Sequence, residues 1–548
     1  MSAKQHTVGQ QLIRLLEAHG VDTVFGIPGV HTAELYRGLA ASGIRHVTPR
    51  HELDAGFMAD GYARASGKPG VCLLITGPGL TNAITAMGQA RADSIPILVI
   101  SGVNPLDTLG RYRGHLHELP DQSAMMRTIA LSSERLERPT ELEAVVARAF
   151  QAMTTGRPGP VHIEIPTDLM EAAVEPAAPR VEPSARPGPS AQSIEAAAKL
   201  CLAASKPLIL AGGGAVWADA AVTSLAERLA APVVTTTNAR GLLAGHPLAI
   251  PASPSLPAVR ALMRESDLVV AIGTQLGPTD YDAYGDGGFP VPGTLVRIDV
   301  DPDAAATSFP ATVSIVTDAG AAARALTDAL GPSVSAENLP SAHDRAADAR
   351  RAAFAELSAK MRSLVEVLGV IRDTLPGCTI VGDSTQLAYA GNLYWEAAAP
   401  RTWFNASTGY GSLGFGPPAA VGASIALGKA PVVCIVGDGG FQFCLGALGA
   451  AADEAAPVIF VVWNNRGYQE IEDYMLSRGI EPVGVRPAAP DFTKIADAYL
   501  IPAQRIRLTD ATSQDALVPG GLDLKRLAEA LRSAQGAAGP ALIEIATP

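Results

Sequence analysis

An aspartate and an asparagine follow two apolar runs in the last third of the chain. Asp438 lies in Val436-Gly-Asp-Gly-Gly-Phe441, and Asn465 follows it by 27 residues, in Trp463-Asn-Asn-Arg-Gly467. This interval matches one strand–helix–strand repeat, and the carboxyl ends of parallel strands share one sheet edge, so the two side chains are expected to meet there. Carboxylate and amide oxygens suit Mg²⁺ or Ca²⁺, and Mg²⁺ commonly bridges a protein to phosphate oxygens.

The glycines around Asp438 favour an anionic ligand beside the cation. Gly437, Gly439 and Gly440 allow close approach of the backbone to a phosphate, at the start of a helix whose N–H groups attract anions. A tight strand-to-helix turn without a ligand would explain this loop alone, but not the asparagine pair at its spacing. No histidine occurs after His343, which excludes an imidazole-rich zinc site from this part of the chain.

The elements that must position these residues are short apolar runs alternating with helical patterns. Continuous apolar strands between helices are typical of parallel sheets covered on both faces, so the sequence predicts three consecutive α/β doubly wound domains. The predicted strands are 44–48, 70–76, 95–101, 207–210, 267–272, 379–382, 431–436 and 457–463, and the predicted helices are 82–92, 219–230 and 445–454.

Two Pro- and Ser-rich segments, 174–190 and 331–343, lack a hydrophobic period and are predicted to be linkers. They divide the chain into expected domains at residues 1–173, 191–330 and 345–548. Each part has an ordinary domain size.

Composition narrows the class of protein. The chain is 48% hydrophobic and 18% charged, which excludes a disordered protein, and its net charge of −12 argues against nucleic-acid or acidic-membrane partners. Five dispersed cysteines without a CxxC pair, and a start without a signal-peptide core, favour a soluble cytoplasmic enzyme. The long uncharged stretch 402–428 contains Pro417, Pro418 and six glycines, so we expect a turn-rich buried segment rather than a membrane span.

The Gly-Asp-Gly-Gly motif followed by Asn-Asn resembles the thiamine diphosphate (ThDP) motif of the pyruvate decarboxylase and acetolactate synthase superfamily. The resemblance covers essentially the whole chain, in the order pyrimidine-binding (PYR), central Rossmann-like and diphosphate-binding (PP) domain. It implies that Asp438, Asn465 and the Gly467 carbonyl hold Mg²⁺, which holds the diphosphate. Further cofactor contacts implied by position are Thr385 and Gln386, after the predicted strand 379–382, Tyr468, and the three glycines 437, 439 and 440.

A glutamate in the first domain supports this resemblance. Glu52 lies in Arg50-His-Glu-Leu-Asp-Ala-Gly, between a short strand and an Ala/Gly-rich helix, and matches the family's activating glutamate. A carboxylate bonded to N1′ of the aminopyrimidine stabilises the imino tautomer, whose 4′-imine removes the thiazolium C2 proton. Alone, Glu52 would also be compatible with a surface helix cap; its loss would have suggested a non-enzymatic relative.

Three glycine-containing segments resemble other cofactor loops of the family. In 409–418, Gly411 matches the carbonyl that receives the 4′-amino group, and Leu413 matches the residue that bends the cofactor. The segments 25–29 (with Pro28 and Gly29) and 77–82 (with Asn82) match loops that reach the cofactor from a partner subunit. The resemblance therefore implies at least a homodimer with shared active sites, and we expect a homotetramer.

Positions at which this chain departs from the family's motifs indicate the class of substrate. The central domain lacks the Gly-Met-His-Gly run of flavin-binding synthases, so we do not expect FAD, and although 212–214 resembles a nucleotide loop we expect no ligand there. Leu116-His117-Glu118 replaces the usual Phe-Gln-Glu, which makes His115 and His117 candidate proton donors.

Other candidate substrate residues follow the Pro-Gly and Asn-Asn motifs. Val30 replaces the aspartate of pyruvate decarboxylase and is followed by His31, while Glu470 and Glu472 lie on a helix that borders the family's substrate channel. A carboxylate there favours a cationic tail, and the chain looks most like 5-guanidino-2-oxopentanoate decarboxylases. A small-molecule 2-oxo acid is thus the expected substrate; decarboxylation of another 2-oxo acid or acetolactate-type carboligation remains the alternative.

Overall fold

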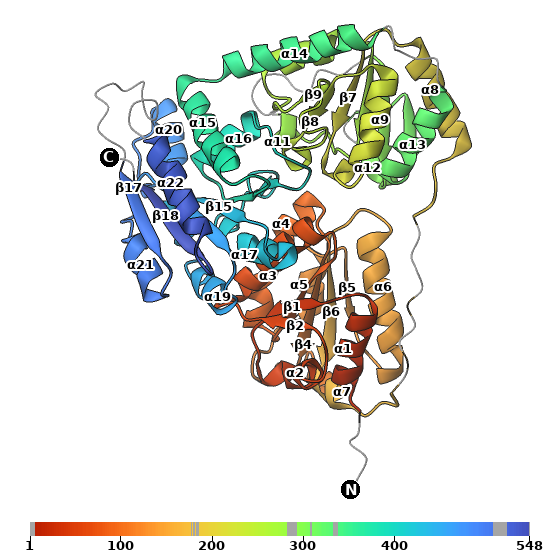
Figure 1. Cartoon of the computed structure of the whole chain (residues 1–548). Helices are drawn as coiled ribbons and strands as arrows, with labels where there is room; N and C mark the ends of the chain where they lie inside the picture. Colours follow the sequence, from red (N-terminus) through yellow and green to blue (C-terminus); the bar gives the residue numbers. More distant parts are fainter. Residues whose placement is uncertain are drawn as a thin grey trace.

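The computed structural model describes residues 6–176, 178, 181, 186–281, 293–306, 309–331, 338–507 and 523–546. Within them the chain forms three six-stranded parallel sheets, each with helices on both faces (Figure 1). The predicted fold class, three consecutive doubly wound α/β domains, is confirmed. None of the helices in these residues is long and apolar enough to cross a membrane.

The first sheet has the strand order β2-β1-β3-β4-β6-β5. Its strands are β1 (Thr23–Gly26), β2 (Arg45–Val47), β3 (Gly70–Leu74), β4 (Ile97–Val103), β5 (Ser132–Arg135) and β6 (Pro160–Pro166). Its helices are α1 (Val8–Ala18), η1 (Val30–Thr32), α2 (Ala33–Leu39), α3 (Glu52–Ser66), α4 (Pro78–Asp93), η2 (Leu106–Thr108), α5 (Gln122–Arg127), η3 (Pro139–Glu141), α6 (Leu142–Thr154) and α7 (Thr167–Glu171).

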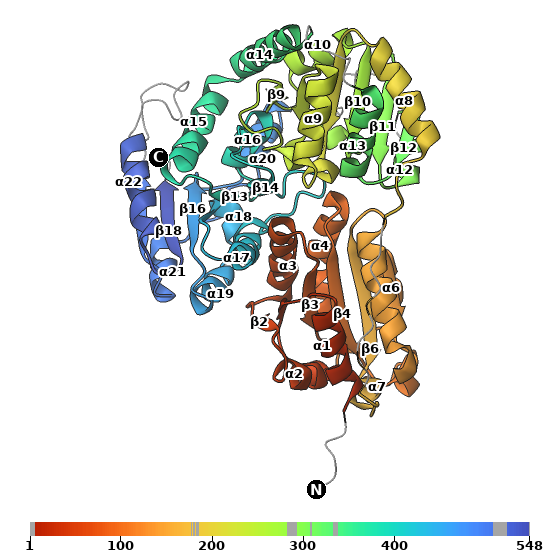
Figure 2. The ribbon, with the colours of Figure 1, turned by 45° about the vertical axis from the view of Figure 1, so that its right-hand side comes forward.

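The second sheet has the order β12-β11-β10-β7-β8-β9. Its strands are β7 (Pro207–Ala211), β8 (Val233–Thr235), β9 (Ala249–Ile250), β10 (Leu268–Ile272), β11 (Leu295–Asp299) and β12 (Val313–Val316). Its helices are α8 (Ala191–Ala203), η4 (Gly213–Ala215), α9 (Asp219–Leu229), η5 (Thr237–Ala239), α10 (Pro257–Glu265), α11 (Pro278–Tyr281), α12 (Pro302–Ala306) and α13 (Ala319–Leu330), followed by α14 (Leu339–Glu356), which leads to the third domain (Figure 2).

The third sheet has the order β14-β13-β15-β16-β18-β17, the same as the first when its strands are counted from β13. Its strands are β13 (Thr379–Gly382), β14 (Trp403–Asn405), β15 (Val432–Gly437), β16 (Val458–Asn464), β17 (Ala503–Arg507) and β18 (Ala541–Ala546). Its helices are α15 (Ala359–Thr374), α16 (Gln386–Leu393), α17 (Gly416–Leu427), α18 (Asp438–Phe441), α19 (Ala447–Asp453), α20 (Gln469–Ser477), α21 (Phe492–Ala498) and α22 (Leu524–Gln535).

Two expectations need correction. The stretch 402–428 is largely buried, apart from the exposed residues 409–411 and 428, but it contains β14 and the twelve-residue helix α17 rather than turns alone. Pro417 and Pro418 occupy the first positions of α17, where the missing N–H costs nothing. The second predicted linker overlaps α14, which begins at Leu339; residues 177, 179–180, 182–185 and 332–337 of the two linkers lie outside the described residues.

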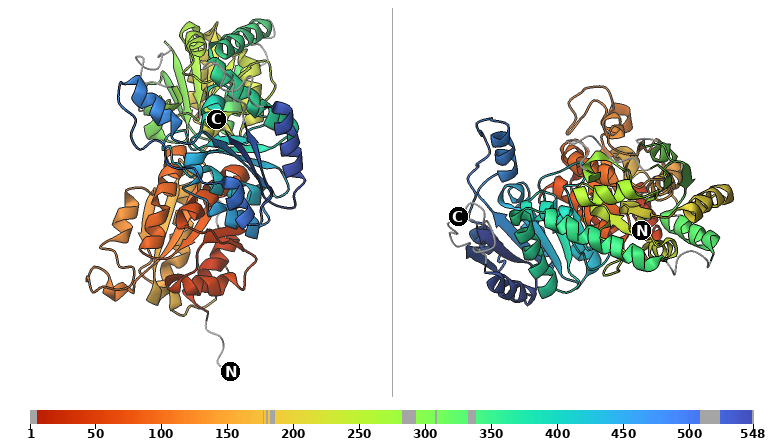
Figure 3. Two further views of the ribbon diagram at one scale, coloured as in Figure 1. Left: turned by 90° about the vertical axis from the view of Figure 1, so that its left-hand side faces the viewer. Right: turned by 90° about the horizontal axis from the view of Figure 1, so that it is seen from above.

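Helices α3 and α17 pack the first domain directly against the third. In the left view of Figure 3, the first domain (red to orange) lies against the third (cyan to blue). Their contact depends on glycine: a Cβ at Gly61 would lie 2.0 Å from the carbonyl oxygen of Ala419, and one at Gly422 would lie 1.9 Å from that of Met58. Phe57 and Phe415 meet edge to face beside them, within one core shared by both domains.

Gly61→Ala is therefore expected to lower the thermal unfolding midpoint by several degrees, because the added methyl group must separate two helix backbones. Differential scanning calorimetry measures the change. Gly369→Ala is the matched control: Gly369 lies in α15 with no atom within 4 Å of the added Cβ, so alanine should stabilise the helix by up to about 1 kcal/mol. Equal midpoints for the two variants would contradict the close contact.

Candidate active site

Three oxygen atoms converge where β15 and β16 end. Asn465 Oδ1 lies 2.9 Å from the carbonyl oxygen of Gly467 and 3.0 Å from Asp438 Oδ1. Rotating the amide turns both approaches into hydrogen bonds from Asn465 Nδ2. Alternatively, the two approaches match the spacing of neighbouring Mg²⁺ ligands, which lie about 3 Å apart when Mg–O distances are about 2.1 Å. Asp438 Oδ2 is buried and has no hydrogen-bond partner among the described residues.

The donor set therefore fits a hard cation. Burial raises the pKa of Asp438, against the opposing effect of nearby backbone N–H groups, so an adjacent positive charge would relieve an unfavourable buried carboxylate. The described residues contain no cluster of three His, Cys, Asp or Glu side chains suited to a metal, which leaves this mixed carboxylate–amide–carbonyl group as the best-formed candidate.

The glycines of the same loop are covered by other predicted cofactor residues. A Cβ at Gly437 would lie 3.3 Å from Thr385 Oγ1, and one at Gly439 would lie 2.5 Å from the Tyr468 ring. Gln386, the first residue of α16, is buried next to Thr385. The structure thus brings together the residues of the diphosphate loop that the sequence selects.

Asp383 is a buried residue of this region that the sequence analysis missed. Its carboxylate accepts hydrogen bonds from the backbone N–H groups of Gly416, at 2.9 Å, and of Ser384, at 2.8 Å. A Cβ at Gly440 would lie 2.7 Å from Asp383 Oδ1 and 3.7 Å from Leu413. Burial raises the pKa of Asp383 to about 6, and Asp383 links loop 437–440 to the segment that carries Leu413. Its place directly after a predicted strand was the available signal.

The segment 411–413 is also held from the first domain. Gly411 has a left-handed backbone, with φ of 76°, and the next amide, of Ser412, donates to Gln89 Oε1 at 3.1 Å. Gln89 in turn donates to Asp93, whose carboxylate also accepts from Thr408. Gln89 and Asp93 of α4 therefore help to position the segment that carries Leu413. The sequence analysis did not predict this role.

Glu52 is the first residue of α3, at the predicted strand–helix junction. Asn82, in the first turns of α4, donates to Glu52 Oε2 at 2.9 Å, and Gly79 lies beside Oε1. Two predicted cofactor residues thus meet at the carboxyl edge of the first sheet. Pro28, Gly29 and Val30 follow β1 at this edge, and Val30 is 76% exposed in the single chain.

The sequence analysis groups His117 with His115, but in the structure His117 contacts His31. His117 packs against His31, with ring centroids 5.4 Å apart and ring planes at 75°. The backbone N–H of His115 donates to Glu118 at 3.0 Å. Among the described residues, the His115 ring stacks on no other aromatic ring.

The two glutamates on α20 differ in their partners. Glu472 is buried and forms an ion pair with Arg486, with Nε at 3.0 Å and Nη2 at 2.5 Å. Glu470 is exposed and has no ion pair among the described residues. Burial, followed by the charge of Glu470, raises the pKa of Tyr389 on α16 to about 12. Only Glu470 therefore offers an uncompensated carboxylate.

A cavity of about 690 Å³ lies at the junction of the three domains, and Asp93 and Thr408 line it on the side of the segment that carries Leu413. It is lined by the glycine run 212–214, Trp217, Asp280 and Arg401, among others, and none of the predicted cofactor residues lines it. The carboxyl-edge loops, rather than this cavity, carry the arrangement that fits a metal–diphosphate group.

Comparison with known proteins gives a consistent family. Models of the N-terminal, central and C-terminal domains of thiamine pyrophosphate enzymes match residues 6–125, 194–326 and 383–545. A Pseudomonas aeruginosa protein assigned as the 2-ketoarginine decarboxylase AruI is 43% identical over 99% of this chain and 94% of its own length. Acetolactate synthase isozyme 1 of Escherichia coli is 32% identical over 84% of this chain and 82% of its own large subunit.

A solved structure from Mycobacterium smegmatis, described as thiamin diphosphate-dependent, superposes with a TM-score of 0.81. It covers 99% of both chains at 25% identity. On the three domain matches, the full-length relative and the site residues together, the chain belongs to the thiamine pyrophosphate enzyme family.

Proposed function

We propose that this protein is a Mg²⁺- and ThDP-dependent non-oxidative decarboxylase whose preferred substrate is 5-guanidino-2-oxopentanoate, also called 2-ketoarginine. The group of Asp438, Asn465 and Gly467 supports the cofactor assignment, because a buried carboxylate oxygen of Asp438 lacks a partner among the described residues beside a carbonyl and an amide, and the loop suits a phosphate. The 43% identity to an assigned 2-ketoarginine decarboxylase supports the reaction.

Bound ThDP would supply a carbon nucleophile and an electron sink for the loss of CO₂. Glu52 would hold a proton against N1′ of the pyrimidine, with Asn82 fixing the orientation of its carboxylate. Leu413 would support the bent cofactor, since Asp383, Gly416 and Gln89 fix its segment. These residues bind, orient and move protons; no further protein nucleophile is required.

Because segments 25–29 and 77–82 match family loops that reach the cofactor from a partner subunit, we further propose that active sites form between subunits, at least in a homodimer. Val30 on the first domain and Ile480 and Val483 beyond α20 are exposed apolar residues in the single chain. Burial of such side chains against a second copy would shield the site from water. Size-exclusion chromatography with light scattering tests for the dimer or the expected tetramer.

Glu470 is the proposed partner of the substrate guanidinium, since Arg486 already neutralises Glu472. Glu470→Gln is expected to raise KM for 5-guanidino-2-oxopentanoate roughly tenfold, because a charge-assisted hydrogen bond is lost, while KM for an uncharged 2-oxo acid of similar length stays within twofold. Steady-state kinetics on both substrates measures the difference.

Asp473→Asn is the matched control on the same helix: Asp473 accepts from Gln469 at 2.7 Å, and its neutralisation should leave the preference unchanged. If Glu470→Gln raises KM equally for both substrates, Glu470 does not recognise the guanidinium group.

The reaction itself is tested by a panel of 2-oxo acids, with separate assays for CO₂, aldehyde and carboligated product. The proposal expects CO₂ and 4-guanidinobutanal in equal amounts. The similarity to acetolactate synthases makes carboligation the alternative reaction. Formation of acetolactate from pyruvate alone would support that alternative and contradict the proposed decarboxylase.

A further inference from the structure

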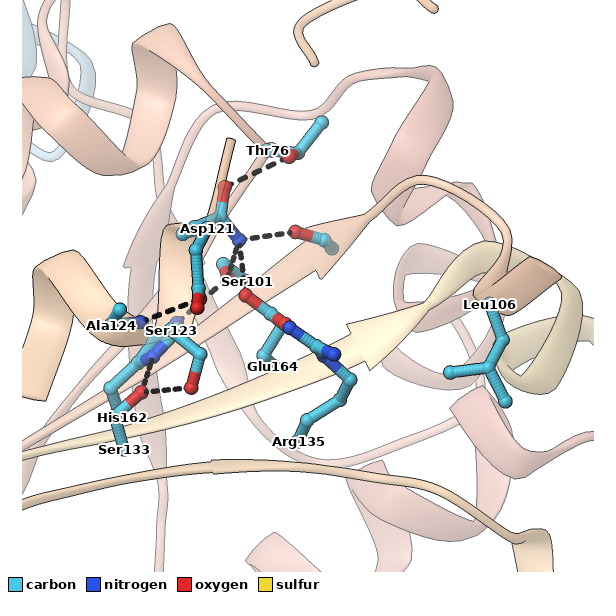
Figure 4. A network of polar contacts seen from close by, with 12 residues as sticks. Thr76, Ser101, Leu106, Asp121, Ser123, Ala124, Ser133, Arg135, His162 and Glu164 are labelled. Atoms are coloured by element: carbon cyan, nitrogen blue, oxygen red, sulfur yellow. Dashed lines mark hydrogen bonds and ion pairs between the residues drawn. The ribbon is translucent and has the colours of Figure 1, made fainter. Parts of the chain in front are cut away.

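A buried glutamate pairs with an arginine on the neighbouring strand in both the first and the third sheet. Glu164 of β6 lies directly opposite Arg135 of β5, and their side chains point toward one another in Figure 4. Glu544 of β18 lies directly opposite Arg505 of β17 and forms an ion pair with it. The two glutamates are 0% and 2% exposed. Because β6 and β5 occupy the same places in the first sheet as β18 and β17 in the third, the two ion pairs are equivalent in position.

Each glutamate also accepts a hydrogen bond from a buried side-chain amide. Gln122 Nε2 donates to Glu164 Oε2 at 3.0 Å, and Asn464 Nδ2 donates to Glu544 Oε1 at 2.7 Å. Gln122 is 2% exposed, and Asn464 is 7% exposed. A carboxylate that pairs with arginine only accepts hydrogen bonds, so it requires the NH₂ end of the amide. The Glu–Arg pair therefore decides which way each amide faces.

The carbonyl end of Gln122 faces the loop after β3. Gln122 Oε1 accepts hydrogen bonds from the backbone N–H of Gly77 at 3.0 Å and from Thr76 Oγ1 at 2.8 Å. Gly77 directly precedes α4, the helix whose Asn82 donates to Glu52. Gln122 consequently holds the start of the helix that orients the proposed activating glutamate.

The carbonyl end of Asn464 faces the loop after β16. Asn464 Oδ1 accepts a hydrogen bond from the backbone N–H of Arg466 at 3.2 Å. Arg466 has a left-handed backbone, with φ of 62°, which a residue other than glycine adopts only where its surroundings impose it. The bond thus holds the turn between Asn465 and Gly467, the two residues that lie beside Asp438.

The two ion pairs place formal charges inside a sheet, where they contribute little to stability. Apolar side chains of similar size commonly stabilise a core as well as a buried ion pair does, because both charges must be desolvated. What the pair supplies instead is a fixed direction for the neighbouring amide, whose two ends differ in being donor and acceptor. The shared arrangement therefore indicates a role in orienting the carboxyl-edge loops.

We propose that Gln122 and Asn464 are equivalent positioning residues, which hold the two loops that face opposite ends of the cofactor. In each domain the buried Glu–Arg pair turns the amide so that its carbonyl binds the loop. Gln122 acts on the pyrimidine end through Glu52 and its partner, and Asn464 acts on the diphosphate end through the proposed metal ligands. The inference rests on the proposed function, but the hydrogen bonds that carry it involve the chain alone.

Amide hydrogen exchange in the cofactor-free protein tests the two contacts directly. Asn464→Leu should speed exchange of the Arg466 N–H by about tenfold or more, because its acceptor is gone, and should leave exchange of the Gly77 N–H unchanged. Gln122→Met should have the reverse effect. Mass spectrometry of short peptides from the two loops measures both rates.

The holoenzyme should show a matching division of effects. Asn464→Leu should weaken ThDP binding at a fixed Mg²⁺ concentration by about tenfold or more, with kcat at saturating cofactor within about threefold of wild type. Gln122→Met should lower kcat by about tenfold and leave ThDP affinity within about threefold, because the loop that it holds carries the partner of Glu52. Calorimetric titration and steady-state kinetics separate the two effects.

An exchange of the two groups distinguishes positioning from general stability. Asn464→Asp places a second carboxylate against Glu544 and should weaken ThDP binding. Adding Glu544→Gln again sets one donor against one acceptor, and it should recover most of the affinity, or restore folding if Asn464→Asp does not fold. A double variant that binds as weakly as Asn464→Asp, or does not fold, would contradict the proposed orientation of the amide.

Gln504→Met is the matched control, because Gln504 lies on β17 and donates to the carbonyl oxygen of Ala530 in α22 rather than to a carboxyl-edge loop. It should change neither exchange rate nor cofactor affinity. Equal effects of Gln122→Met and Asn464→Leu on both loops, or a lower unfolding midpoint with unchanged exchange rates, would overturn the proposal. If the wild-type protein binds no ThDP, the proposed function fails, and the exchange rates still decide whether the amides hold their loops.

Discussion

Glu52→Gln is expected to lower kcat by roughly 10³-fold, which corresponds to about 4 kcal/mol of transition-state stabilisation. Glutamine keeps the shape of the side chain and can still contact Asn82, but it cannot hold a mobile proton against the pyrimidine ring. ThDP affinity should stay within a few-fold of wild type, because the proposed metal and diphosphate contacts lie in the other domain. Calorimetric titration of ThDP and steady-state kinetics separate the two effects.

Glu195→Gln provides the control for this substitution. Glu195 is 70% exposed on α8 and pairs with Lys199 at the surface, so its neutralisation should change neither kcat nor cofactor binding. A Glu52→Gln variant that keeps more than a tenth of wild-type turnover would remove Glu52 from the proposed mechanism.

Asp438→Asn is expected to weaken binding of ThDP in the presence of Mg²⁺ by about 100-fold or more. The substitution preserves shape but removes the only formal charge from the group of Asp438, Asn465 and Gly467, and Mg²⁺ binds neutral ligands poorly without a carboxylate. The cofactor-free protein should be at least as thermally stable as wild type, since Asp438 Oδ2 is buried without a partner among the described residues.

Cofactor affinity at several Mg²⁺ concentrations, together with the unfolding midpoint of the cofactor-free protein, measures both parts of this expectation. Asp473→Asn, on an exposed carboxylate of α20, controls for a general change in charge. Unaltered Mg²⁺ dependence in Asp438→Asn would place the cation elsewhere, whereas a large loss of stability would show that Asp438 is structural.

The sequence was sufficient for the fold class because continuous apolar runs mark buried parallel strands directly. It also placed Asp438 and Asn465 at one edge, since successive parallel strands deliver their ends to the same side of a sheet. It missed α17 because Pro417 and Pro418 were treated as breakers, although both occupy the first turn of a helix.

Side-chain partnerships were less accessible from the sequence. His31 and His117 come from strands separated by β3, and no local spacing connects them. The pairing of Glu472 with Arg486 likewise depends on a loop beyond the end of α20. Helical periodicity limits which carboxylates can share a face, but tertiary packing decides which of them is neutralised.

The identical strand order of the first and third sheets suggests how one chain came to present two similar sheet edges. The Asn82 segment follows β3, and the Asp438 loop follows the corresponding strand β15. Likewise the His117 loop follows β4, and the Asn465 loop follows the corresponding strand β16. Repetition of one ancestral unit would have supplied two equivalent edges, one for the proposed proton transfer and the other for the proposed cation site. The reciprocal fit of Gly61 and Gly422 then resembles an isologous subunit contact preserved inside one polypeptide.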